Sequence, residues 1–145
     1  GIPSKQETFK ETFHINELEA ALKQADIVVN TLPSTDDTYQ LLNQTTLSYC
    51  SNVLLFNVGR GESVDNKALL LAIKNKWVEH AFLDVFECEP LTQEHPFWKL
   101  PQVTITPHIA ALSEPRQVVE IFANNYQQWR DGFTLNHTID FDKGY

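Results

Sequence analysis

Residues 53–61 read VLLFNVGRG: four apolar residues, then an asparagine and a valine, then an arginine between two glycines. A short apolar run that stops at turn-forming residues is typical of a buried strand. The run is continuous rather than alternating, as in a parallel sheet that helices cover on both faces. Three other stretches have the same form, and we predict them as strands: 27–29, 81–86 and 103–106.

The segments between these strands carry helical patterns. Asn16, with Glu19 three residues later, has the spacing of a capping box ahead of an apolar stripe. Asp65 or Asn66 is expected to cap a second helix, and 44–50 is expected to form a short one. Strands that alternate with helices predict an α/β fold with right-handed crossover connections.

A longer helix is expected over 114–131. Ser113 can cap it, Pro115 suits its first turn, and Gly132 can end it. Its apolar residues recur at helical spacing: Val118, Phe122, Tyr126 and Trp129. Residues 133–145 show little periodicity and are expected to form a tail.

Composition excludes several classes of protein. The 145 residues are 42% hydrophobic and 21% charged, which is ordinary for a globular domain with a real core. The net charge of −8 argues against partners that need a basic surface, namely nucleic acids and anionic membranes. No apolar run approaches the roughly 20 residues of a membrane helix. We see no secretory signal, and two cysteines are too few for a disulfide framework, so a cytoplasmic location is expected.

Chemically useful side chains follow three of the predicted strands. Arg60, Glu89 and His108 come after the second, third and fourth strands, and ligands of open α/β sheets bind beyond these carboxyl ends. An arginine offers a planar fork of donors that matches a carboxylate. A histidine can give or take a proton near neutral pH, and a carboxylate beside it can fix its tautomer. Together they could bind an acid and protonate a neighbouring carbonyl oxygen.

Each of these residues also has a simpler explanation. Arg60 could be a surface arginine in a tight turn, Glu89 could be one more solvated carboxylate, and His108 could be a loop histidine bonded to the backbone. Asp84 lies inside a predicted apolar strand, where a charge needs a partner. It therefore either faces a ligand cleft or caps a nearby loop.

Other site chemistries fit less well. Cys88 with His108 carries no sign of an activated thiol, and adding His95 gives no recognisable metal-ligand spacing. Gly59-x-Gly61 is half of a phosphate-binding fingerprint whose third glycine is missing. We expect no metal site and no pyrophosphate-binding loop here.

Four motifs, in this order, resemble the signatures of the D-isomer-specific 2-hydroxyacid dehydrogenases. Residues 26–38, DIVVNTLPSTDDT, are similar to the stretch that precedes the family's arginine signature. Residues 57–65, NVGRGESVD, look like that signature itself. Residues 83–91, LDVFECEPL, look like the glutamate signature, and 95–110, HPFWKLPQVTITPHIA, look like the histidine signature. The resemblance covers nearly the whole chain.

The resemblance implies an oxidoreductase that reduces a small 2-oxo acid to the 2-hydroxy acid. Within the family the chain looks most like the glyoxylate/hydroxypyruvate reductases. Arg60 is then implied to bind the substrate carboxylate and His108 to donate the proton, with Glu89 paired to His108. The resemblance also implies a homodimer for the complete enzyme.

The implied cofactor is NADP or NAD. Contacts to nicotinamide and ribose are implied for six residues: Leu32, Pro33, Val58, Gly59, Asp84 and Ala110. Ser4 and Lys5 are implied to lie near the adenine ribose. An acidic residue there would favour NAD, and none precedes Glu7, so NADP is preferred.

Members of this family are about twice as long, and their Gly-x-Gly-x-x-Gly loop has no counterpart in residues 1–145. The expected fold is therefore a partial doubly wound, Rossmann-type parallel sheet without its first strands, followed by a long C-terminal helix. Residues 1–110 would be the C-terminal part of the nucleotide-binding domain. Residues 111–145 would be a helix and tail that return to a substrate domain.

In the usual strand order the absent strands would lie between the first strand of this chain and the others. The strand at 53–58 would then lose a neighbour and expose a sheet edge. We expect the chain either to associate through that edge or to pair 27–33 directly with 53–58. A non-catalytic module for nucleotide sensing or assembly is the alternative function, with the isolated chain inactive.

Overall fold

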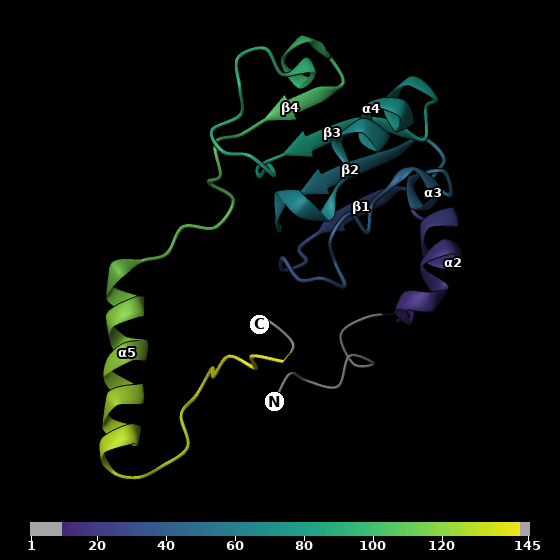
Figure 1. The fold of residues 1–145 in the computed structure, drawn as a ribbon. Helices are drawn as coiled ribbons and strands as arrows, with labels where there is room; N and C mark the ends of the chain where they lie inside the picture. The colour runs from purple at the N-terminus through teal and green to yellow at the C-terminus, as the bar shows by residue number, and fades with distance from the viewer. Residues whose placement is uncertain (1–9, 143–145) are drawn as a thin grey trace.

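The computed structural model describes residues 10–142, which form one parallel sheet, the helices that pack on it, and a long helix that leaves it (Figure 1). In chain order the elements are η1 (Ile15–Glu17), α2 (Leu18–Lys23), β1 (Ile27–Asn30), α3 (Gln44–Leu47), β2 (Val53–Asn57), η2 (Gly61–Ser63), α4 (Asn66–Lys74), β3 (Val78–Leu83), η3 (Pro96–Lys99), β4 (Val103–Ile105) and α5 (Pro115–Arg130). All four predicted strands are present.

The strands lie in the order β1-β2-β3-β4, and each pairs in parallel with the next. The register is set by facing residues: Ile27 and Leu54, Leu55 and Ala81, Leu83 and Ile105. Parallel neighbours need a crossover connection, and α3 and α4 supply two of them.

The expectation that the strand at 53–58 loses a neighbour is wrong. β2 pairs with β1 on one side and with β3 on the other, because the connection through α3 brings consecutive strands side by side. The alternative, direct pairing of 27–33 with 53–58, is confirmed over β1. Within the described residues the strand with only one neighbour at this end of the sheet is β1.

The core lies on one face of the sheet. Helices α2, α3 and α4 bury Leu22, Leu47 and Leu69 against inward-facing strand residues such as Leu55 and Ala81. Burial alternates along β2, and the opposite face carries the stacked rings of Phe56 and Phe82, 4.3 Å apart.

From the continuous apolar runs we expected helices on both faces of the sheet. In residues 10–142 the helices that pack on the sheet cover only one face. On β1, at one end of the open face, Ile27 and Val29 are each 57% exposed. The apolar runs have the composition of strands buried on two sides, and the described helices cover one.

Two expected helix starts are confirmed, and the start of the first helix is corrected. Asp65 caps α4 by accepting the backbone N–H groups of Lys67 and Ala68, and a short helix does form within 44–50. The first capping box is not made by Asn16 and Glu19. His14 and Glu17 make it instead, because the chain enters a 3-10 turn two residues earlier than the pattern suggested.

The C-terminal helix α5 matches the expected span within one residue, with Pro115 at its first position. Ser113 is not its cap: the N-cap residue is Glu114, whose side chain makes no capping hydrogen bond. None of the side chains of α5 is buried, and Figure 1 shows the helix apart from the sheet. Gly132, just beyond it, has a φ of 78°, which suits a helix end.

No helix in residues 10–142 is both long enough and apolar enough to cross a bilayer.

Candidate active site

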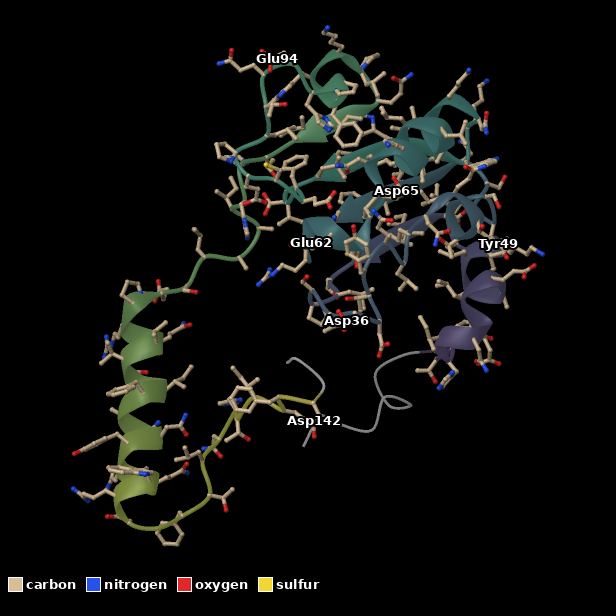
Figure 2. All side chains as sticks on the ribbon, viewed as in Figure 1. Asp36, Tyr49, Glu62, Asp65, Glu94 and Asp142 are labelled. Atoms are coloured by element: carbon tan, nitrogen blue, oxygen red, sulfur yellow. The ribbon has the colours of Figure 1, made fainter. Side chains whose placement is uncertain are left out.

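The loops that follow β1, β2, β3 and β4 gather at the carboxyl edge of the sheet. In Figure 2, Asp36 and Glu62, which follow β1 and β2, lie on the side toward which the strands point, whereas Tyr49 lies on the opposite side. A backbone hydrogen bond of 2.8 Å from Gln40 N–H to the carbonyl of Glu62 ties these two loops together.

A buried polar group holds the loop that carries Arg60. Asn30 and Asn57 end β1 and β2, and the Asn30 side-chain amide donates to Asn57 Oδ1 (2.9 Å) and to Ser63 Oγ (2.5 Å). Asn57 Nδ2 and Ser63 Oγ both donate to the carbonyl of Arg60 (3.2 and 2.6 Å). Asn57 is 1% exposed, so these hydrogen bonds are shielded from water and fix the turn.

Sequence reasoning missed this group. The signal was an asparagine at the last position of two apolar runs, where a polar side chain can pair the backbone groups that the sheet leaves unpaired. Asn30 Oδ1 accepts from Leu32 N–H (3.1 Å), and Asn57 Oδ1 accepts from Gly59 N–H (3.3 Å).

The glycines beside Arg60 serve close packing between backbones. A Cβ on Gly59 would lie 2.7 Å from the backbone of Leu32, and a Cβ on Gly61 would lie 1.9 Å from the carbonyl carbon of Phe86. The loops after β1 and β3 therefore pack directly against these two glycines.

Replacing Gly61 by alanine is therefore expected to destabilise the chain strongly. The new methyl group meets the Phe86–Glu87 backbone, which has no flexible side chain to yield, so we expect a cost of about 3 kcal/mol or more in the free energy of unfolding. Urea unfolding followed by circular dichroism would measure it.

Gly132→Ala is the matched control. It places the same methyl group in open space at a positive φ, where the cost is about 1 kcal/mol. Equal losses for the two variants would contradict the packing role of Gly61.

Asp84 follows β3 directly and is 4% exposed. The strand ends earlier than predicted, at Leu83, although the Asp84 N–H still bonds to the carbonyl of Asn57 (3.0 Å). The Asp84 carboxylate accepts hydrogen bonds from Thr106 Oγ1 and from the backbone N–H groups of Ile109 (2.9 Å) and Ala110 (2.8 Å). The two roles that we treated as alternatives are both seen: the carboxylate caps a nearby loop, and Asp84 also lines the cavity described below.

The pKa of Asp84 lies below its ordinary value. Burial by itself would raise that pKa, but the hydrogen bonds from Thr106, Ile109 and Ala110 favour the charged carboxylate and outweigh it.

Glu89 and His108 are brought together as expected. The Nδ1 of His108 lies 2.9 Å from Oε2 of Glu89, and the other carboxylate oxygen accepts the backbone N–H of Phe86 (2.8 Å). The bond from His108, followed by that from Phe86, lowers the pKa of Glu89 below its ordinary 4.5. The His108 side chain remains 52% exposed, so its far nitrogen is accessible.

A cavity of about 470 Å³ adjoins this pair. Its lining combines four polar side chains, Asp84, Glu89, Thr106 and His108, with six apolar ones: Phe86, Pro90, Leu91, Trp98, Ile105 and Pro107. A larger cavity of about 740 Å³ lies at the opposite, amino-terminal edge of the sheet, where α4 and residues that start or precede strands line it, such as Asn52, Val78 and Gln102. Ligands of open α/β sheets bind at the carboxyl edge instead. The smaller cavity is therefore the candidate site.

Arg60 is exposed at the same edge but does not line this cavity. Over residues 10–142 its side chain makes one hydrogen bond, from Nη1 to the carbonyl of Gly59 (2.8 Å). The structure thus joins Glu89 with His108 and leaves the Arg60 guanidinium available to a ligand.

The six residues implied for nicotinamide and ribose lie at this edge in differing environments. Val58 is 38% exposed and Ala110 is exposed, Leu32 and Pro33 are half-buried, and Gly59 is packed against backbone. The Asp84 carboxylate accepts the three hydrogen bonds described above. Ser4 and Lys5 lie outside the described residues, and no cluster of three metal-ligating side chains occurs in the described part.

Glu89→Gln is expected to make the chain less stable at pH 7 than the unchanged protein. Because the folded-state pKa of Glu89 is depressed, its stabilising effect is full above about pH 4.5 and disappears as the pH falls through the lowered value. The gap between the two unfolding curves should therefore close in acid. Urea unfolding at several pH values between neutrality and acid would show this.

Glu94→Gln, an exposed glutamate of the same acidic loop, is the control. A stability gap for Glu89→Gln that stays constant with pH would contradict the charge pairing.

The comparisons with known proteins agree with the fold. The family model for the NAD binding domain of the D-isomer specific 2-hydroxyacid dehydrogenases matches residues 2–110. The chain belongs to this family.

Solved structures give the same result. A D-isomer specific 2-hydroxyacid dehydrogenase from Xanthobacter autotrophicus Py2, in complex with NADPH and MES, is 34% identical with a TM-score of 0.86, over 90% of this chain and 54% of that one. An NADPH-dependent glyoxylate/hydroxypyruvate reductase from Sinorhizobium meliloti, in complex with NADP and sulfate, is 33% identical with a TM-score of 0.88, over 93% and 45%.

A D-isomer specific 2-hydroxyacid dehydrogenase family protein from Aeromonas salmonicida subsp. salmonicida A449 is 40% identical, with a TM-score of 0.84, over 92% of this chain and 44% of that one. The chain spans about half the length of the solved structures it matches.

Proposed function

We propose that this chain carries the carboxylate-binding and proton-donating residues of an NAD(P)-dependent oxidoreductase that reduces a small 2-oxo acid, glyoxylate or hydroxypyruvate, to the 2-hydroxy acid. The observation that carries the proposal is the His108–Glu89 pair, 2.9 Å between Nδ1 and Oε2, beside a cavity at the carboxyl edge of a parallel sheet. Family membership supports the reaction class, and the S. meliloti reductase supports the substrate.

The pair is suited to deliver a proton from a defined atom. Glu89 accepts from Nδ1 of His108, which leaves Nε2 as the nitrogen that donates to the substrate's carbonyl oxygen. Glu89 stays ionised because two hydrogen bonds stabilise its charged form, so it stabilises the proton on Nδ1. In this scheme Glu89 orients His108 and His108 transfers the proton.

Arg60 is proposed to bind the substrate carboxylate. Its planar fork can make two parallel hydrogen bonds to a carboxylate, and its side chain is exposed. The hydrogen bonds from Asn57 and Ser63 to the Arg60 carbonyl fix the backbone of Arg60, so only its side chain has to move to reach a ligand.

The residues present fit the nicotinamide end of the cofactor. Val58 offers an exposed apolar surface, and the carboxylate of Asp84 retains one free acceptor position, on Oδ2. A bound nicotinamide would supply the hydride. NADPH is the proposed form, because no acidic residue precedes Glu7 and two relatives were solved with NADPH or NADP.

Residues 1–110 are proposed as the C-terminal part of the nucleotide-binding domain and 111–145 as a helix and tail that return to a substrate domain. The homodimer and the cytoplasmic location stay predictions. The alternative, a nucleotide-sensing or assembly module, also stays a prediction.

The reaction can be tested in a chimera that joins residues 1–145 to the upstream half of the A. salmonicida relative. We expect it to oxidise NADPH with glyoxylate or hydroxypyruvate, and His108→Ala to lower kcat by about 10²- to 10⁴-fold, the usual contribution of a general acid. Absorbance at the NADPH band measures both. Turnover of His108→Ala within tenfold of the parent, or no turnover despite tight NADPH binding, would count against the proposal.

Arg60→Lys in the same chimera is expected to raise KM for the 2-oxo acid by about 10- to 100-fold, because a lysine cannot make the paired hydrogen bonds. Lys67→Arg, an exposed position on α4, is the control for changes in positive side chains. An unchanged KM for Arg60→Lys would remove Arg60 from the substrate site.

Residues 1–145 alone are expected to show no measurable NADPH binding, since they contain no pyrophosphate-binding loop. Fluorescence titration is the measurement. A micromolar dissociation constant would overturn this expectation and would favour the sensing module.

A further inference from the structure

The hydrogen bonds of Asp84 surround His108 on both sides along the chain. Thr106 lies two residues before His108, and Ile109 and Ala110 are the two residues after it; all three donate to the same carboxylate. Asp84 itself is buried and anchored at the end of β3, with its N–H bonded to Asn57. The loop that carries His108 is therefore held by a fixed charge on the neighbouring strand.

The backbone of His108 needs such a restraint. Its φ is 54°, in the left-handed region that residues with a Cβ seldom adopt. A residue remains there only when the surrounding structure fixes it, as the three hydrogen bonds of Asp84 do. This conformation brings Nδ1 of His108 to Glu89, which lies on a separate loop.

We infer that Asp84 is the positioning residue of His108: by holding the donors on either side of it, the Asp84 carboxylate keeps the imidazole against Glu89 with Nε2 facing the substrate. Its catalytic meaning rests on the proposed function, because His108 must be the proton donor for its placement to affect turnover. In this scheme Asp84 acts on the proton transfer through the His108 loop, and its remaining acceptor position on Oδ2 stays open to the cofactor.

This role differs from the contact to cofactor that the family resemblance implies for Asp84. Three of the roughly four acceptor positions of the carboxylate are taken by the chain's own donors. If Asp84 only bound cofactor, replacing it would leave the loop around His108 unchanged.

The first experiment uses residues 1–145 and requires no activity. Histidine side-chain nitrogen spectra and nuclear Overhauser contacts from the His108 ring to Glu89 report the tautomer and the pairing. We expect Asp84→Asn, which places amide hydrogens against one of its three donors, to abolish the ring-to-Glu89 contact and mix the two tautomers. Thr106→Val removes a single donor and should weaken the contact, and Thr106→Ser should restore it.

Asp65→Asn is the matched control, because Asp65 also accepts two backbone N–H groups, at the start of α4 and outside the 106–110 loop. It should leave the His108 signals unchanged. Signals of His108 that stay native in both Asp84→Asn and Thr106→Val would overturn the inference, as would an equal disturbance by Asp65→Asn. If Asp84→Asn does not fold, the two Thr106 variants decide.

The second experiment measures kinetics in the chimera. We expect Thr106→Val to lower kcat by about tenfold and Asp84→Asn by roughly 10²-fold, the loss that follows from misplacing a catalytic group by about 1 Å, while KM for the 2-oxo acid stays within about twofold because Arg60 is on another loop. A rise in KM for NADPH alone would favour the cofactor contact instead. An inactive chimera whose His108–Glu89 contact still depends on Asp84 would refute the proposed function and leave the positioning role intact.

Discussion

Hydrogen bonds from buried side chains at the ends of the strands determine where the candidate catalytic groups lie. A parallel sheet stops pairing at its carboxyl edge, and the loops beyond it must satisfy their backbone groups elsewhere. Asn57 does this for the turn that carries Arg60, and Asp84 does it for the loop that carries His108. Arg60 is thereby held from the end of its own strand, β2, and His108 from the end of the neighbouring strand, β3.

Much of the fold could be predicted from the sequence, because apolar runs and turn residues are local signals. The existence of the four strands, their approximate positions along the chain and the span of α5 were of this kind. The pairing of Glu89 with His108 was predictable for a geometric reason: strands in a parallel sheet end at one edge, so residues that follow them meet.

The rest depends on which strands become neighbours, and single-sequence patterns do not specify that. The predicted gap beside 53–58 arose from assigning 27–30 to the wrong place in the strand order; the register between β1 and β2 excludes it. The role of Asn30 follows only once β1 lies beside β2, because its partners are on that strand and on the turn after it. The tight contact of Gly61 with Phe86 has the same origin.

The open face of the sheet shows where sequence and structure must be considered together. Val29, Phe56 and Phe82 belong to apolar runs whose composition suits burial on two sides, yet the described helices cover only the opposite face. The apolar stripe of α5, with Phe122 70% exposed, is likewise unburied. Exposed apolar surface of this extent favours association in water. Of the two outcomes expected for the strand at 53–58, association through its edge is excluded, because β2 has a neighbour on each side. Within residues 10–142 the unpaired edge at this end of the sheet belongs to β1, beside the exposed side chains of Ile27 and Val29.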